Sequence, residues 1–140
     1  MNAVRAILLV LMLGFLAIAI ESRSEHRYLL EERREAWIPV YSSIVLAGAC
    51  LMGFARKKAL TALAAVLFAL GIGVGALGLF YHTQFKPLAF QRLFDGVGSY
   101  QSPETDEPGF NESAPALAPL GLVGLSTVGF IVVVGLRRGK

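Results

Sequence analysis

Two histidines and two carboxylates have the side-chain types that a metal or haem site needs. His26 and His82 are the two histidines of the chain, and Glu21 and Glu25 shortly precede His26. Imidazole and carboxylate together suit Zn, Fe, Mn or Cu, and two histidines alone could ligate a haem iron from both sides. The sequence therefore offers a metal site made from Glu21, Glu25, His26 and His82, or a cofactor site made from His26 and His82.

The spacing of these residues also fits a plain interfacial role. On a helix, Glu21 and His26 would point about 140° apart, and no pair among the four has the spacing of an established metal motif. A histidine at the end of a membrane span commonly places its ring where the helix meets water. The single cysteine, Cys50, cannot form a disulfide or a thiolate cluster within one chain. We therefore expect no cofactor, and we keep a haem or a transition metal as the alternative.

The elements that must hold these residues are four long apolar segments. Of the 140 residues, 55% are hydrophobic and only 16% are charged, against about 25% charged in soluble domains. A helix needs about 20 apolar residues to cross about 30 Å of hydrocarbon, and four segments almost free of charge come close to that length. The sequence predicts an all-α transmembrane four-helix bundle in one membrane domain, 1–140, with spans at about 4–20, 37–55, 59–81 and 116–136, and extracytoplasmic loops at 21–36 and 82–115.

The first segment also has features of a secretory signal peptide. Arg5 precedes its apolar run, and Ala17 and Ala19 form a cleavage-like pattern. The apolar run is longer than that of an ordinary signal peptide. We therefore expect the segment to be kept as the first span.

The charges beside the spans favour one orientation. With the N-terminus in the cytoplasm, the inner segments carry seven basic residues and no acidic one: Arg5, Arg56, Lys57, Lys58, Arg137, Arg138 and Lys140. The outer loops then hold the other six basic residues and all ten acidic ones. Because cytoplasmic loops are enriched in Lys and Arg, we expect both termini in the cytoplasm and a multi-pass protein of the bacterial inner (plasma) membrane.

Glycines recur at helical spacing in the third and fourth segments. Small residues let two helix backbones approach closely, although glycine is also common in membrane helices without such a role. Both interpretations stay open. In the first, helices three and four pack tightly together or against a partner through Gly71, Gly75, Gly78, Gly121, Gly124 and Gly129.

Three short stretches resemble those of a group of bacterial proteins. They read ESRSEHRYLLEERREAWIPV, GLFYHTQF and NESAPALAPLGL. They are similar to stretches of small uncharacterised four-helix inner-membrane proteins, in which a Glu and a His follow helix one and a His ends helix three. The resemblance implies the same architecture and a role for Glu21, His26 and His82. It implies no activity, and the residues after His26 are richer in charge here.

Several classes of function fit the sequence poorly. The middle of each span lacks Asp, Glu, Lys, Arg, His, Asn and Gln, so the chain has no group to hold a proton or cation as a self-contained pump must. It shows no Ser/His/Asp order and no phosphate loop, so we do not expect an enzyme. Its basic residues lie beside spans, which excludes nucleic acid as the expected partner.

The leading interpretation is a non-catalytic accessory or structural subunit of a larger bacterial membrane complex, respiratory or redox in class. Its partners would be the lipid bilayer and other membrane subunits or further copies of the chain. One alternative is a haem- or metal-binding membrane protein that uses outer-side His26 and His82. Another is a small homo-oligomeric channel or carrier, lined by hydroxyls from Ser42, Ser43, Thr61, Ser126 or Thr127. The role of the acidic loop 95–113 stays open.

Overall fold

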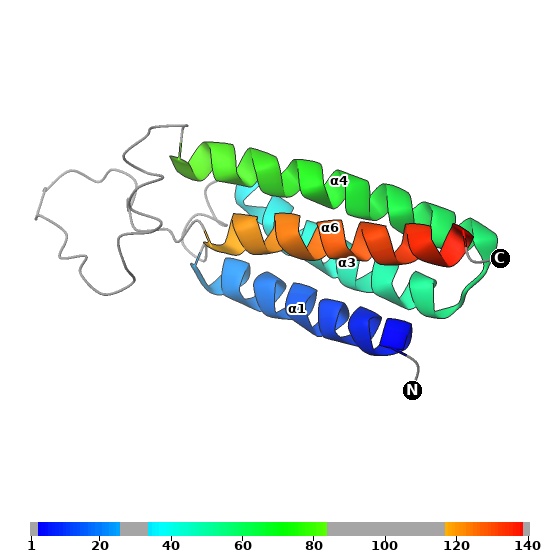
Figure 1. The fold of residues 1–140 in the computed structure, drawn as a ribbon. Helices are drawn as coiled ribbons and strands as arrows, with labels where there is room; N and C mark the ends of the chain where they lie inside the picture. Colours follow the sequence, from blue (N-terminus) through cyan, green and yellow to red (C-terminus); the bar gives the residue numbers. More distant parts are fainter. Residues whose placement is uncertain (1–2, 26–33, 84–116, 139–140) are drawn as a thin grey trace, which may run out of the picture.

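The computed structural model describes residues 3–25, 34–83 and 117–138, which are helical throughout apart from the short turn at 55–57. Four long helices account for almost all of them: α1 (Ala3–Glu25), α3 (Ile38–Phe54), α4 (Lys58–Thr83) and α6 (Leu117–Arg138). A single 3-10 turn, η1 (Arg34–Trp37), leads directly into α3 (Figure 1). The predicted all-α class and its four helices are confirmed. The first helix continues to Glu25, past the predicted span of 4–20.

The turn between α3 and α4 is tight and is closed by backbone hydrogen bonds. Arg56 has a φ of 52°, a left-handed conformation that ends α3. The N–H of Arg56 donates to the carbonyl oxygen of Gly53 at 3.3 Å, and the N–H of Thr61 donates to the carbonyl oxygen of Lys57 at 2.9 Å. At the other end of α3, Pro39 lies in the first turn, where its missing N–H breaks no helical hydrogen bond.

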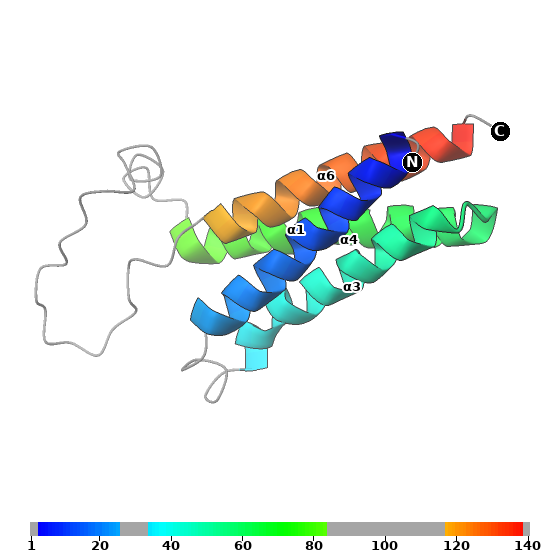
Figure 2. The ribbon, with the colours of Figure 1, turned by 90° about the horizontal axis from the view of Figure 1, so that it is seen from below.

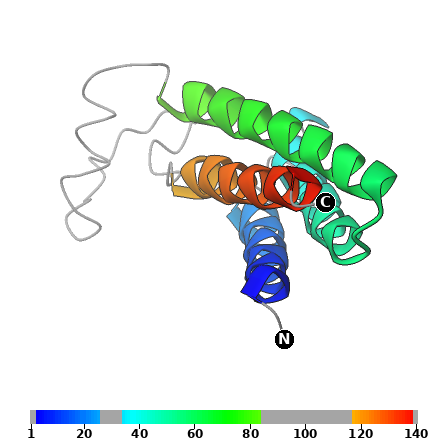
Figure 3. The ribbon, with the colours of Figure 1, turned by 45° about the vertical axis from the view of Figure 1, so that its right-hand side comes forward.

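The helices run alternately up and down. The start of α1, the turn from α3 to α4 and the end of α6 therefore lie at one end of the bundle (Figure 1). We call this the turn end and the opposite end, where α1 and α4 finish, the loop end. The most extensive contact is between α4 and α6, followed by α1 with α3 and α3 with α4. α1 and α4 lie at opposite corners, with α6 between them in Figure 3, and α1 is inclined to α6 in Figure 2.

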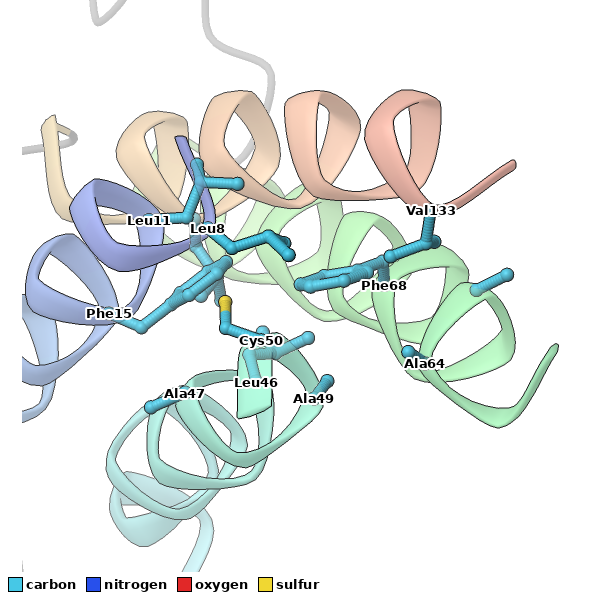
Figure 4. Packing of buried hydrophobic residues seen from close by; sticks show 12 residues of the cluster. Leu8, Leu11, Phe15, Leu46, Ala47, Ala49, Cys50, Ala64, Phe68 and Val133 are labelled. Carbon is cyan, nitrogen blue, oxygen red and sulfur yellow. The ribbon is translucent and has the colours of Figure 1, made fainter. Parts of the chain in front are cut away.

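Large side chains from all four helices fill the centre. Leu8, Phe15, Leu46, Phe68 and Val133 are each less than 2% exposed. The rings of Phe15 and Phe68 stack with centroids 6.1 Å apart and planes 25° from parallel, so they join the two diagonal helices across the core (Figure 4). The interior is therefore occupied by the chain's own side chains.

The outward faces of the helices are apolar. Three helices contain segments long and apolar enough to cross a membrane: Ala3–Ser24, Lys58–Phe80 and Ala118–Leu136. α3, with 17 residues, is the shorter fourth apolar helix. Large hydrophobic side chains are exposed on all four, including Val10, Leu51, Leu70 and Ile131. The chain thus has the make-up of a multi-pass membrane protein.

Candidate functional site

The helices that carry the predicted ligands finish at the same end of the bundle but at opposite corners of it. Glu21 is exposed on the last part of α1, and Glu25 is the final residue of that helix. His82 lies in the last turn of α4. The side chains of Glu25 and His82, and all of His26, lie outside the described residues. Within the described ranges no three His, Cys, Asp or Glu side chains come together as a metal site would require, so the histidine site stays a prediction.

Most hydroxyl groups inside the helices are bonded within their own helix. The Oγ atoms of Ser42 and Ser43 donate to the carbonyl oxygen of Pro39 at 3.1 and 2.7 Å. Thr61 donates to the carbonyl oxygen of Lys58 at 3.0 Å, and a similar bond at 2.8 Å joins Thr127 to the carbonyl of Val123. Such bonds let a hydroxyl lie in an apolar helix at little cost. They also take up the donors that a polar pore lining would present.

Ser126 on α6 is the exception among these hydroxyls. The side chain is fully buried, and its Oγ has no hydrogen-bond partner within the part of the chain that the structure describes. The oxygen faces α4, because a methyl group placed on Gly71 would lie only 2.6 Å from it. Ser126 therefore packs its hydroxyl against the bare backbone of Gly71, an arrangement that only a weak Cα–H···O contact can compensate.

Two glycines of α4 leave no room for a side chain. A methyl group on Gly71 would also lie 2.8 Å from a Leu46 methyl carbon. One on Gly75 would meet Val123 Cγ2 at 2.7 Å and the carbonyl oxygen of Pro119 at 3.0 Å. The second contact is with backbone, which cannot rotate away. A side chain at Gly75 would therefore push α4 and α6 apart.

The remaining predicted packing glycines have different surroundings. A methyl group on Gly129 would lie 2.7 Å from the Phe68 ring, whereas Gly78 and Gly121 have their nearest neighbours at 3.4 Å, an ordinary contact distance. Nothing lies within 4 Å of a methyl group on Gly124, which is exposed. Gly14 and Gly53 lie outside the glycine pattern of the third and fourth segments, yet methyl groups added to them would lie 2.9 Å from Leu125 Cδ1 and 3.0 Å from Leu8 Cδ1.

The two ends of the bundle differ in charge. At the turn end, Arg5, Lys57 and Lys58 are exposed, and no acidic residue lies there among the described ranges. At the loop end, acidic and basic residues mix, with Glu21 and Arg34 both exposed. An electrostatic partner at the turn end would therefore have to be anionic.

An aromatic pair lies at the loop end, where η1 passes into α3. The rings of Trp37 and Tyr41 stack with centroids 5.3 Å apart and planes 24° from parallel. Tyr41 and its neighbour Ile38 are both more than half exposed.

Comparisons with protein-family models, with curated proteins and with solved structures find no match for this chain.

Proposed function

We propose that the chain is a non-catalytic accessory subunit of a larger complex in the bacterial inner membrane, with both termini in the cytoplasm. The observation that carries this proposal is the contrast between its interior and its exterior. The interior is packed with apolar side chains from all four helices, while the exposed surface of the helices is apolar as well. Such a body can act through its outer surface, since the part of its interior that the structure describes is filled mainly by its own apolar side chains.

Membrane insertion of α3, the shortest of the four helices, is supported by the combined length of η1 and α3 and by the aromatic residues at one end of this segment. α3 alone, with 17 residues, is about 26 Å long, and the four residues of η1 add about 8 Å. Together they reach the roughly 30 Å of a hydrocarbon core. Trp37 and Tyr41 lie at one end of this combined segment, the level at which such rings are enriched in membrane helices. We propose that all four helices span the bilayer.

The orientation is supported by the charges of the turn end. Arg5, Arg56, Lys57 and Lys58 belong to this end, and so do Arg137 and Arg138, the last two residues of α6. The positive-inside rule places such a cluster in the cytoplasm. The loop end would then face the periplasm.

Cysteine labelling tests both insertion and orientation. Cys50 is fully buried, and Cys50→Ala removes the only native thiol. In that background Lys57→Cys and Arg34→Cys place a thiol at the turn end and the loop end. With a membrane-impermeant maleimide on intact cells, Arg34→Cys should react and Lys57→Cys should react only after permeabilisation. The reverse pattern would overturn the orientation, and recovery of the protein in the soluble fraction would overturn insertion.

The subunit role is supported by the bonding of the hydroxyl groups inside the helices and by the small residues on their outward faces. The hydroxyls of Ser43, Thr61 and Thr127 are bonded to their own helices, so they do not favour a pore. The outward faces combine bulky side chains with small ones, such as Gly73 on α4 and Gly124 on α6, which have open space around them. Small residues on an outer face allow another membrane helix to approach closely.

Gentle extraction from the native membrane tests the subunit role. The mass of the assembly, its other chains and its visible absorption spectrum are recorded for the wild type and for His82→Ala. The proposal expects a particle that contains other chains and is unchanged in the variant, with any haem or metal bound by those chains. A single-chain or purely homo-oligomeric particle would contradict it. A haem or metal that copurifies with the chain alone and is lost in His82→Ala would support the histidine site instead.

A further inference from the structure

The outer surface of η1 and the first half of α3 changes in character along its length. Arg34 is exposed at the start of η1, followed by the stacked pair of Trp37 and Tyr41. Beyond them Ile44 and Val45 are both about half exposed. Positions three or four apart share one face of a helix, so the order along this face is cationic, then aromatic, then aliphatic.

This order matches the chemistry of one membrane leaflet read from its surface inward. A guanidinium binds phosphate oxygens with two parallel hydrogen bonds. Tyrosine and tryptophan rings prefer the level of the headgroup and glycerol, where one edge is apolar and the other is wet. From Arg34 to Val45 the rise is about 18 Å, enough to pass from the phosphates into the acyl chains.

We propose that this face binds an anionic phospholipid. Arg34 contacts the headgroup phosphate, the Trp37 and Tyr41 pair lies beside the glycerol and ester groups, and Ile44 and Val45 contact an acyl chain. The proposal rests on the membrane insertion proposed above. It assigns the loop end of α3 to lipid and therefore leaves the outer faces of the other helices for protein partners.

An anionic phospholipid fits this face better than a protein helix does. The exposed side chains here are large and branched or aromatic, whereas close helix contacts in membranes use small residues. The cation at the start of η1 complements a negatively charged headgroup. A single basic residue near a membrane surface is worth about a fivefold preference for anionic lipid.

Trp37 is the only tryptophan of the chain, so its fluorescence reports on this face alone. The purified protein is reconstituted into vesicles that contain a fixed fraction of brominated phospholipid, because bromine quenches tryptophan on contact. Bromines near the glycerol end should quench Trp37 more than bromines near the chain terminus. At equal fractions, brominated phosphatidylglycerol should compete for the contact about fivefold better than brominated phosphatidylcholine.

Two variants separate this site from general attraction to anionic lipid. Arg34→Gln should abolish the preference, and Lys58→Gln, at the opposite end of the bundle, should leave it unchanged. Equal quenching by both lipids in the wild type overturns the site, and so does a preference that survives in Arg34→Gln. If no brominated lipid quenches Trp37, this face does not contact lipid and the site is overturned, whereas the proposed membrane insertion fails only if the protein is recovered in the soluble fraction.

Discussion

The two faces of α4 show how residues two positions apart in one helix come to serve opposite roles. Gly71 faces the interior, where Ser126 and Leu46 occupy the space a side chain would need. Gly73 faces outward and has nothing within 4 Å of an added methyl group. Phe68 is fully buried, whereas Leu70 is 61% exposed. A glycine and a large apolar residue therefore form a fixed helix contact on the inner face of α4, whereas a glycine and a large apolar residue on its outer face form an open surface.

The inner face should be the more sensitive to loss of volume. Phe68→Ala removes the ring that stacks on Phe15 and contacts Gly129. We expect a loss of about 3 kcal/mol in the free energy of unfolding, near the lower end for Phe→Ala in soluble cores, because transfer into lipid replaces transfer into water. Leu70→Ala on the outer face should change it by less than about 0.5 kcal/mol. Titration with sodium dodecyl sulfate, followed by circular dichroism, measures both, and equal losses would contradict the assignment of the two faces.

Adding a methyl group should also affect stability differently on the two faces of α4. Gly75→Ala places a methyl group 3.0 Å from backbone atoms of Pro119 and Val123, so α4 and α6 must move apart. We expect a loss of about 2 kcal/mol, as for other overpacked sites. Gly73→Ala meets nothing and removes a flexible residue from the helix, so it should stabilise by about 0.5 kcal/mol. The same titration checks the pair, and a destabilising Gly73→Ala would show that this face is also in close contact.

A smaller effect than that of Phe68→Ala or Gly75→Ala is expected at the unpartnered hydroxyl of Ser126. Ser126→Ala removes a buried donor that has no partner among the described residues, and it should stabilise the protein by about 1 kcal/mol. It should also relieve part of the clash in Gly71→Ala, because the Ser126 oxygen is the atom nearest to the added methyl group. A double-mutant cycle measures this coupling. Additive effects of the two changes would mean that the hydroxyl does not face Gly71.

The sequence predicted the helices well because the absence of charge over a long segment has few other causes. It could not predict which faces meet. Gly124 and Gly129 are five residues apart and so point about 140° from each other on a helix; they cannot both face α4, and only Gly129 lies against it. The stacking of Phe15 on Phe68 across the bundle depends on how the helices cross, which no local pattern encodes. The histidine site stays a prediction, because His26 and the His82 side chain lie outside the described residues.

The subunit role is tested most directly by photocrosslinking in the native membrane. A photoreactive amino acid is placed at one exposed position on each helix: Val10, Leu51, Leu70 and Ile131. Matched buried positions serve as controls: Leu8, Cys50, Phe68 and Val133. We predict that at least one outward position forms an adduct with a different membrane protein, and that the buried positions form none. Adducts with lipid or with a second copy of the chain alone, at all four outward positions, would contradict the account.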